Sequence, residues 1–214
     1  MKFRRLGSTD IDVSAICLGT MTFGMQNDQA EAHSQLDRAL AAGVNFIDTA
    51  EMYPVPPAAE TCGRSEIIVG HWLKRQPRDR IVLATKAAGP GRGMAWIREG
   101  GMNFDRRNLR AALEGSLRRL QTDHVDLYQL HWPDRNVQMF GQYRFDPQNE
   151  KPTVAIRATL EVLAELVAEG KIRAVGLSNE CPWGVMEFVR LANEFNLPLV
   201  VSLQNAYNLL NRTY

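Results

Sequence analysis

The chain has 214 residues, 45% of them hydrophobic, and its 25 basic and 24 acidic side chains give a formal net charge of +1. A chain of this length can bury one sizeable core, and the balanced charge argues against nucleic acid or an anionic membrane as a partner. Three cysteines without CxxC spacing, no signal-peptide-like start and no apolar run of about 18 residues favour a soluble cytoplasmic protein.

The predicted elements alternate between strand and helix. A hairpin is expected first, with residues 2–6 and 11–13 flanking the turn at 7–10. Five helices are predicted by apolar periodicity and capping residues, Asp105 and Thr153 among them. These helices cover 28–43, 65–75, 105–120, 153–170 and 182–195, and six strands cover 15–20, 44–48, 81–86, 125–131, 172–177 and 199–203. This alternation predicts an α/β fold with a parallel sheet.

Three successive apolar strands each end on a different titratable side chain, namely Asp48, Lys86 and His131. Tyr53 follows Asp48 by five residues. In a parallel barrel the carboxyl ends of the strands meet on one face, where active sites are built. Taken singly, a strand that stops at a solvated Asp and a structural His are the ordinary interpretations. The repetition favours a site.

The chemistry of these four side chains is specific. A lysine at the mouth of a barrel needs a paired carboxylate, and Asp48 can supply it. An ammonium group beside Tyr53 would lower the phenol pKa from its usual value of about 10. Such a tyrosine can donate a proton to a carbonyl oxygen, which a neutral His131 could orient. Nothing in the set is an activated nucleophile, so the site needs a hydride source.

Two other patterns are weaker. The run Gly89-Pro90-Gly91-Arg92-Gly93 follows a strand, but its spacing fails GxGxxG, so no dinucleotide fingerprint is expected there. The four histidines have neither HExxH nor paired spacing, so we expect no metal. His33 and His71 fall in predicted helices and His124 in a loop.

Five motifs, in order along the whole chain, resemble the signatures of the aldo-keto reductase family. These motifs are Gly19-Thr20-Met21-Thr22-Phe23-Gly24, Asp48-Thr49-Ala50-Glu51-Met52-Tyr53, Ala84-Thr85-Lys86, residues 126–132 and Gly176-Leu177-Ser178-Asn179. The runs at 50–57 and 204–212 are similar to the bacterial Tas-type branch.

This resemblance implies a (β/α)8 TIM barrel that reduces a small-molecule carbonyl substrate with NADPH. It implies that Tyr53 is the general acid, that Lys86 and Asp48 tune it, and that His131 orients the carbonyl. It places Ser178, Asn179 and Gln204 on the nicotinamide carboxamide. The further implied cofactor contacts are Gly19, Thr20, Met21, Asp48 and Tyr207, and the implied substrate contacts are Tyr53, His131, Trp132 and Phe140.

The resemblance also implies that the barrel is incomplete. A barrel of this type needs about 250 residues and eight strands, whereas the sequence predicts a hairpin and six strands. We therefore expect residues 1–214 to be one barrel domain without strands 7 and 8, as a fragment of a longer product. A non-catalytic cofactor-binding subunit and an inactive fragment stay open as alternatives. The carbonyl substrate, the choice between NADP and NAD, and the oligomeric state stay open too.

Two features of the surface follow. Trp132, Phe140, Tyr143 and Phe145 crowd the loop after His131, and we expect a mobile apolar lid over the substrate. Scattered surface aromatics are the alternative. Because six strands cannot close a barrel, the first and sixth strands are expected to be bare edges. The side chains expected to lose inner packing partners are Ile16, Leu18, Val200 and Leu203.

Overall fold

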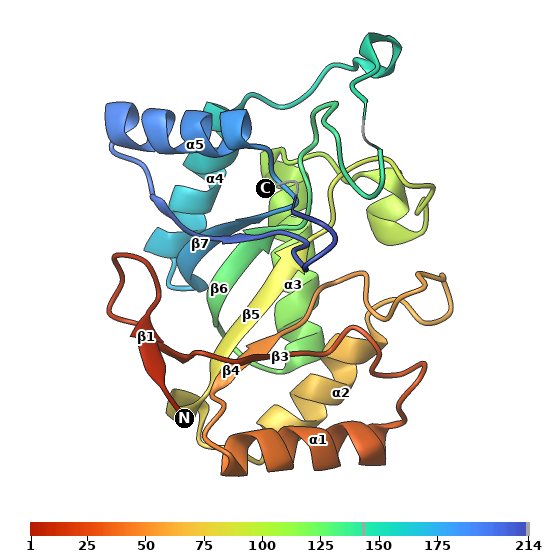
Figure 1. Cartoon of the computed structure of the whole chain (residues 1–214), viewed down its shortest axis with the longest axis vertical. Coiled ribbons are helices and arrows are strands. Elements are labelled where there is room, and N and C mark those ends of the chain that lie inside the picture. Colours follow the sequence, from red (N-terminus) through yellow and green to blue (C-terminus); the bar gives the residue numbers. More distant parts are fainter. Residues whose placement is uncertain (143, 213–214) are drawn as a thin grey trace.

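The computed structural model describes residues 1–142 and 144–212. Its centre is a six-stranded parallel sheet with strand order β3-β4-β5-β6-β7-β8 (Figure 1). The strands are β3 (Cys17–Gly19), β4 (Phe46–Asp48), β5 (Val82–Ala87), β6 (Val125–Leu130), β7 (Ile172–Ser178) and β8 (Val200–Gln204). An antiparallel hairpin of β1 (Phe3–Arg5) and β2 (Asp12–Ser14) precedes them. The predicted architecture, a hairpin and six strands of an incomplete (β/α)8 barrel, is confirmed.

The helices form one layer, in which each helix packs beside the next along the chain. They are α1 (Gln29–Ala41), α2 (Arg64–Leu73), α3 (Arg106–Leu120), α4 (Ile156–Ala168) and α5 (Pro182–Phe195). Short 3-10 turns lie at η1 (Arg78–Arg80), η2 (Ile97–Gly100) and η3 (Pro147–Asn149). Among the described residues, no helix is long and apolar enough to cross a membrane.

The helix boundaries follow local capping chemistry. Asp28 and Glu31 form a reciprocal capping box at the start of α1, and Asp105 accepts from the backbone N–H of Asn108 at the start of α3. The predicted Thr153 cap is wrong. Helix α4 begins later, after Ala155, with no side-chain cap, so burial of its apolar face rather than a capping bond fixes its start.

The two faces of the sheet are covered differently. The face toward the helices carries the main apolar core, whereas the opposite face is filled at the amino ends of the strands by the hairpin. There Leu6, Ile11 and Val13 pack with Val82 and Leu127. Since side chains alternate along a strand, Asp48 and Lys86 lie on this same inner face, further toward the carboxyl ends.

The two edges of the sheet are β3 and β8, as predicted. Ile16 and Leu203 are 60% and 47% exposed. The prediction was wrong for the other two side chains, because Leu18 and Val200 are half-buried against the main core. Leu18 and Val200 are in register with Ile47 and Val175, which belong to the main core, so both face the helices rather than the inner face. Leu203 faces the same way, in register with Leu177, but remains exposed.

Candidate active site

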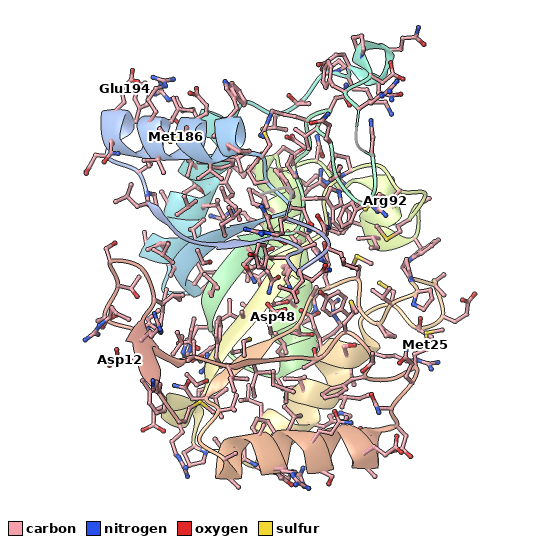
Figure 2. The ribbon with its side chains drawn as sticks, viewed as in Figure 1. Asp12, Met25, Asp48, Arg92, Met186 and Glu194 are labelled. Atoms are coloured by element: carbon pink, nitrogen blue, oxygen red, sulfur yellow. The ribbon has the colours of Figure 1, made fainter. Side chains whose placement is uncertain are left out.

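Four side chains predicted from the strand ends come together on the inner face. Asp48 is the last residue of β4, Lys86 lies near the end of β5, His131 directly follows β6, and Tyr53 lies in the loop after β4. All four are buried. Figure 2 shows Asp48 near the middle of the sheet, surrounded by the loops that follow the strands. The sequence therefore predicted a real cluster.

The Lys86 ammonium group joins the members of this cluster. Its Nζ donates to Asp48 Oδ2 at 2.5 Å, to the carbonyl oxygen of Thr49 at 2.9 Å and to the Tyr53 hydroxyl at 3.3 Å. The other Asp48 oxygen, Oδ1, accepts from Gln129 Nε2 at 2.9 Å. With three donors satisfied and a paired carboxylate, the buried ammonium is held in one position.

Burial and neighbouring charges shift the pKa values of Lys86 and Tyr53 in opposite directions. For Lys86, burial lowers the pKa, but Asp48 and Tyr53 together outweigh it, so the net pKa is raised and the side chain stays charged. For Tyr53, burial raises the pKa more than Lys86 lowers it. The pKa of Tyr53 is thus raised, whereas the effect of Lys86 alone predicted that it would be lowered. The difference arises because the phenol is buried.

The His131 ring stands edge-on to Tyr53, with 5.5 Å between ring centroids. Burial, followed by the charges of Lys86 and Arg92, lowers its pKa well below the usual value. A neutral ring carries one N–H donor and one acceptor nitrogen. Nδ1 is buried and has no partner among the described residues. The site therefore holds a neutral imidazole next to the phenol.

An aromatic segment follows His131. Trp132 is buried and lies 4.8 Å from the His131 ring, and the half-exposed Phe140 lies 6.0 Å from Trp132. Phe140 and Asn179 help to line a cavity of about 300 Å³. Phe140 thus lies at a cavity, and a mobile lid over the substrate stays a prediction. Tyr143, also expected there, lies outside the described residues, and Phe145 is exposed.

The expected cofactor residues lie at the ends of β7 and β8. Ser178 Oγ donates to the carbonyl oxygen of Gln204 at 2.9 Å, and Asn179 Nδ2 donates to Ser178 Oγ at 3.1 Å and to the carbonyl oxygen of His131 at 2.9 Å. These bonds tie the ends of β7 and β8 to the backbone of His131. Asn179 has a left-handed backbone with φ +52°, a conformation that Asn tolerates better than most residues.

The remaining expected cofactor residues are more scattered. Thr20 is buried and donates from Oγ1 to the carbonyl oxygen of Asp48 at 3.0 Å, whereas Met21 and Tyr207 are 47% and 65% exposed. A Cβ placed on Gly19 would meet nothing within 4 Å, so the space beside Asp48 is open. The structure brings Gly19 and Thr20 next to Asp48 and leaves Tyr207 in solvent.

The amide side chains at the ends of β7 and β8 fit a nicotinamide carboxamide. Among the described residues, the Asn179 amide oxygen and both polar atoms of the Gln204 side chain have no hydrogen-bond partner. Asn205 Oδ1 is likewise unpaired, although it is buried. Unpaired amide groups beside an open cavity are suited to binding a polar planar ligand. No cluster of three or more possible metal ligands occurs among the described residues.

Sequence reasoning missed two residues that hold the site together. Gln129 fixes the free oxygen of Asp48, and Arg98 forms an ion pair with the buried Glu51. Glu51 also accepts from the Ala88 backbone N–H at 2.5 Å, and Arg98 Nη2 donates to the Ala88 carbonyl oxygen at 3.0 Å. The Tyr53 loop is thereby fastened to the loop after β5. A polar Gln inside an otherwise apolar strand was the available signal for Gln129.

A parallel half-barrel with a buried Tyr–Lys–Asp cluster and a neutral His at its carboxyl end is the arrangement that the aldo-keto reductase motifs of the sequence imply. The model of the Aldo/keto reductase family matches residues 15–214, and the chain belongs to that family. Protein tas of Escherichia coli is 47% identical over 215 residues, covering 100% of this chain and 62% of tas. This similarity supports the Tas-type branch.

Other relatives agree. The NADH-specific methylglyoxal reductase of Escherichia coli is 33% identical over 229 residues, covering 99% of this chain and 60% of that protein. The crystal structure of a thermostable aldo-keto reductase with the inhibitor epalrestat superposes with a TM-score of 0.74 at 27% identity, covering 99% of this chain and 65% of the other. The chain thus spans about six tenths of the length of these relatives.

Proposed function

We propose that the protein reduces an aldehyde or ketone to an alcohol with NADPH, and that Tyr53 donates the proton to the carbonyl oxygen. The observation that carries this proposal is the contact of the Tyr53 hydroxyl with Lys86 Nζ at 3.3 Å, while the same nitrogen is paired with Asp48. This arrangement supplies a proton donor and a fixed positive charge at one oxygen.

The reaction needs two electrons and a proton at the carbonyl group. A nicotinamide cofactor, when bound, supplies the electron pair as a hydride to the carbonyl carbon. Tyr53 supplies the proton to the oxygen, and the Lys86 ammonium group stabilises the phenolate that is left behind. Because burial raises the pKa of Tyr53, the phenol is protonated at neutral pH and ready to act as an acid.

His131 and the strand-end amides orient the reactants. The neutral imidazole can donate one hydrogen bond to the substrate oxygen beside Tyr53, and its lowered pKa keeps it from adding a further charge. Ser178, Asn179 and Gln204 would hold the nicotinamide carboxamide. Because one relative is named NADH-specific, both nicotinamide cofactors belong in the assay, with NADPH expected to be preferred.

The test is the reduction of a panel of aldehydes and ketones by the full-length product of which this chain is expected to be a part, followed by nicotinamide absorbance, with Tyr53→Phe as the variant. General acids contribute about 10²–10⁴-fold to rates, so we expect kcat to fall by at least about 10²-fold while NADPH affinity is kept. Tyr128→Phe is the matched control, since it removes a buried phenol whose hydroxyl has no partner among the described residues.

Two outcomes would contradict the proposal. A Tyr53→Phe variant with unchanged kcat would exclude Tyr53 as the acid. Wild-type protein that binds NADPH but reduces no carbonyl compound would favour the alternative, a non-catalytic cofactor-binding subunit.

A further inference from the structure

The glycine-rich segment between β5 and η2 has an unusual backbone. Gly91, Arg92 and Gly93 have φ angles of +87°, +66° and +69°. Glycine adopts this region freely, but for a residue with a Cβ the left-handed conformation costs about 1–2 kcal/mol. An arginine between two glycines in this conformation suggests that its side chain, rather than its backbone, is what the position requires.

The base of this segment is fixed on the aromatic part of the site. Trp132 Nε1 donates to the Pro90 carbonyl oxygen at 3.1 Å. A Cβ on Gly89 would lie 2.7 Å from the Trp132 indole, so only glycine allows this approach. The segment is therefore held against the residue that follows the catalytic histidine, and its tip carries Arg92.

The Arg92 guanidinium group lies over two aromatic rings. Its Cζ is 4.0 Å from the Phe140 ring centroid and 5.8 Å from that of Trp132. Trp132 in turn contacts the His131 ring, which contacts Tyr53. Figure 2 shows Arg92 on the group of loops beyond Asp48, on the side away from α5. An unbroken series of rings thus leads from the catalytic phenol to this cation.

Arg92 is an exposed cation that has no counter-ion among the described residues. No ion pair or hydrogen bond joins it to a carboxylate in the described part of the chain, whereas Arg98 in the same loop is paired with Glu51. Its charge still acts on the reacting groups, since it contributes, after burial and Lys86, to the lowered pKa of His131. A stacked, oriented guanidinium with free N–H groups is a ready donor for a carboxylate.

We propose that Arg92 binds a carboxylate group on the substrate, so that the preferred substrates are aldehydes or ketones that carry an acid group. This inference rests on the proposed carbonyl reductase function and names its substrate class. The exposed Phe140 ring would contact the part of the substrate between its carbonyl and its carboxylate, with the buried Trp132 ring supporting it from behind. The expected nicotinamide residues Ser178 and Gln204 lie instead at the ends of β7 and β8, on the other side of His131.

The experiment compares kcat/KM for para-carboxybenzaldehyde and benzaldehyde, which share one ring and one reacting group. We expect wild-type protein to prefer the carboxylated aldehyde and Arg92→Gln to lower the ratio of the two kcat/KM values about tenfold, as for one charge-assisted hydrogen bond. Arg92→Lys should keep part of the preference. Using the ratio cancels any effect of the lost stacking on turnover itself.

Arg157→Gln is the matched control. Arg157 also stacks on an aromatic ring, with its Cζ 3.8 Å from the Phe195 centroid, but it belongs to α4 and contacts α5. The ratio should be unchanged in this variant, and the KM for NADPH should be unchanged in Arg92→Gln.

Three other results are each decisive against either the carboxylate contact or the proposed function. An equal ratio in wild type and Arg92→Gln would exclude the carboxylate contact. A raised KM for NADPH in Arg92→Gln, with the ratio kept, would assign Arg92 to a cofactor phosphate and overturn the inference. If no aldehyde were reduced, the proposed function would fail, and calorimetric binding of benzoate to wild type and Arg92→Gln would still decide whether Arg92 holds a carboxylate.

Discussion

The ends of β4–β6 and the ends of β7–β8 are built differently. In the first region Asp48, Lys86 and Gln129 are buried and joined by hydrogen bonds of 2.5 and 2.9 Å. In the second region Gln204 is exposed and its side-chain amide has no partner among the described residues. The groups around the proposed acid Tyr53 are thus preorganised within the sheet, whereas the groups expected to bind the cofactor are still available for a ligand.

The position of each strand explains this difference. Strands β4 to β7 all have hydrogen-bonded neighbours on both sides, and the hairpin fills the space beneath their inner face. Strand β8 pairs with β7 alone and strand β3 with β4 alone. The Lys86–Asp48 pair lies on two of these inner strands, β5 and β4, whereas Gln204 lies on the edge strand β8.

The largest expected effect is on the folding and association state of the chain, and it arises at the two edge strands. We expect the 214-residue chain, expressed by itself, to be oligomeric or molten, because both edge strands present unpaired backbone and apolar side chains. Leaving about 400 Å² of apolar edge uncovered costs about 10 kcal/mol at about 25 cal/mol per Å², comparable with the whole stability of a domain.

Size-exclusion chromatography with light scattering checks this prediction. Leu203→Lys places a charge on the β8 edge and should reduce self-association, whereas Met186→Lys alters a similarly exposed side chain on α5 and should not. A monodisperse wild-type monomer with a sharp melting transition and micromolar NADPH affinity would show that six strands suffice.

The next largest effect is expected at the buried pair. Lys86→Met leaves Asp48 buried without its cation, which typically costs about 3–5 kcal/mol of stability. Turnover should fall as well. In the pH-rate profile of any remaining activity, the alkaline limb should move to higher pH than in wild type, because the phenolate of Tyr53 has lost its stabilising charge. Urea unfolding and pH-rate profiles of the full-length product, of which this chain is expected to be a part, measure the two effects.

Lys171→Met is the control for this variant. Lys171 is paired with Glu114 and Glu169 near the surface, where ion pairs contribute little. Equal losses of stability in Lys86→Met and Lys171→Met would mean that the buried pair is no better organised than a surface pair.

Sequence reasoning went furthest where a local pattern determines the outcome. Asp48, Lys86 and His131 were predictable because each ends an apolar strand, and Asp105 because it precedes a periodic helix. The ion pair of Glu51 with Arg98 was not, because 47 residues separate the two and Arg98 belongs to an irregular turn. The direction of the Tyr53 pKa was missed because burial depends on the whole fold.

A smaller effect should appear in the pH dependence of stability. The pKa of His131 is lowered on folding, so below the usual value of about 6.5 the unfolded chain binds a proton that the folded chain does not. Stability should therefore fall as the pH falls below about 6.5, by about 1.4 kcal/mol per pH unit, until the folded ring is protonated. Urea midpoints for wild type and His131→Asn measure this slope, and an identical slope in both would exclude His131 as its source.

The smallest effect is expected for Gln204 at the end of β8, where a substitution should change NADPH affinity without changing stability. Gln204→Ala removes an exposed amide that no described residue uses, so the urea midpoint should stay within error of wild type. If this amide binds the nicotinamide carboxamide, the Kd for NADPH should rise by up to about tenfold, as for the loss of one neutral hydrogen bond.

Ser178→Ala is the matched variant, because its hydroxyl bonds both Gln204 and Asn179 and its removal should lower stability as well as affinity. Fluorescence titration with NADPH and urea unfolding of the two variants give the comparison. A Gln204→Ala variant that lost stability but kept its NADPH affinity would mean that the end of β8 serves the fold and not the cofactor.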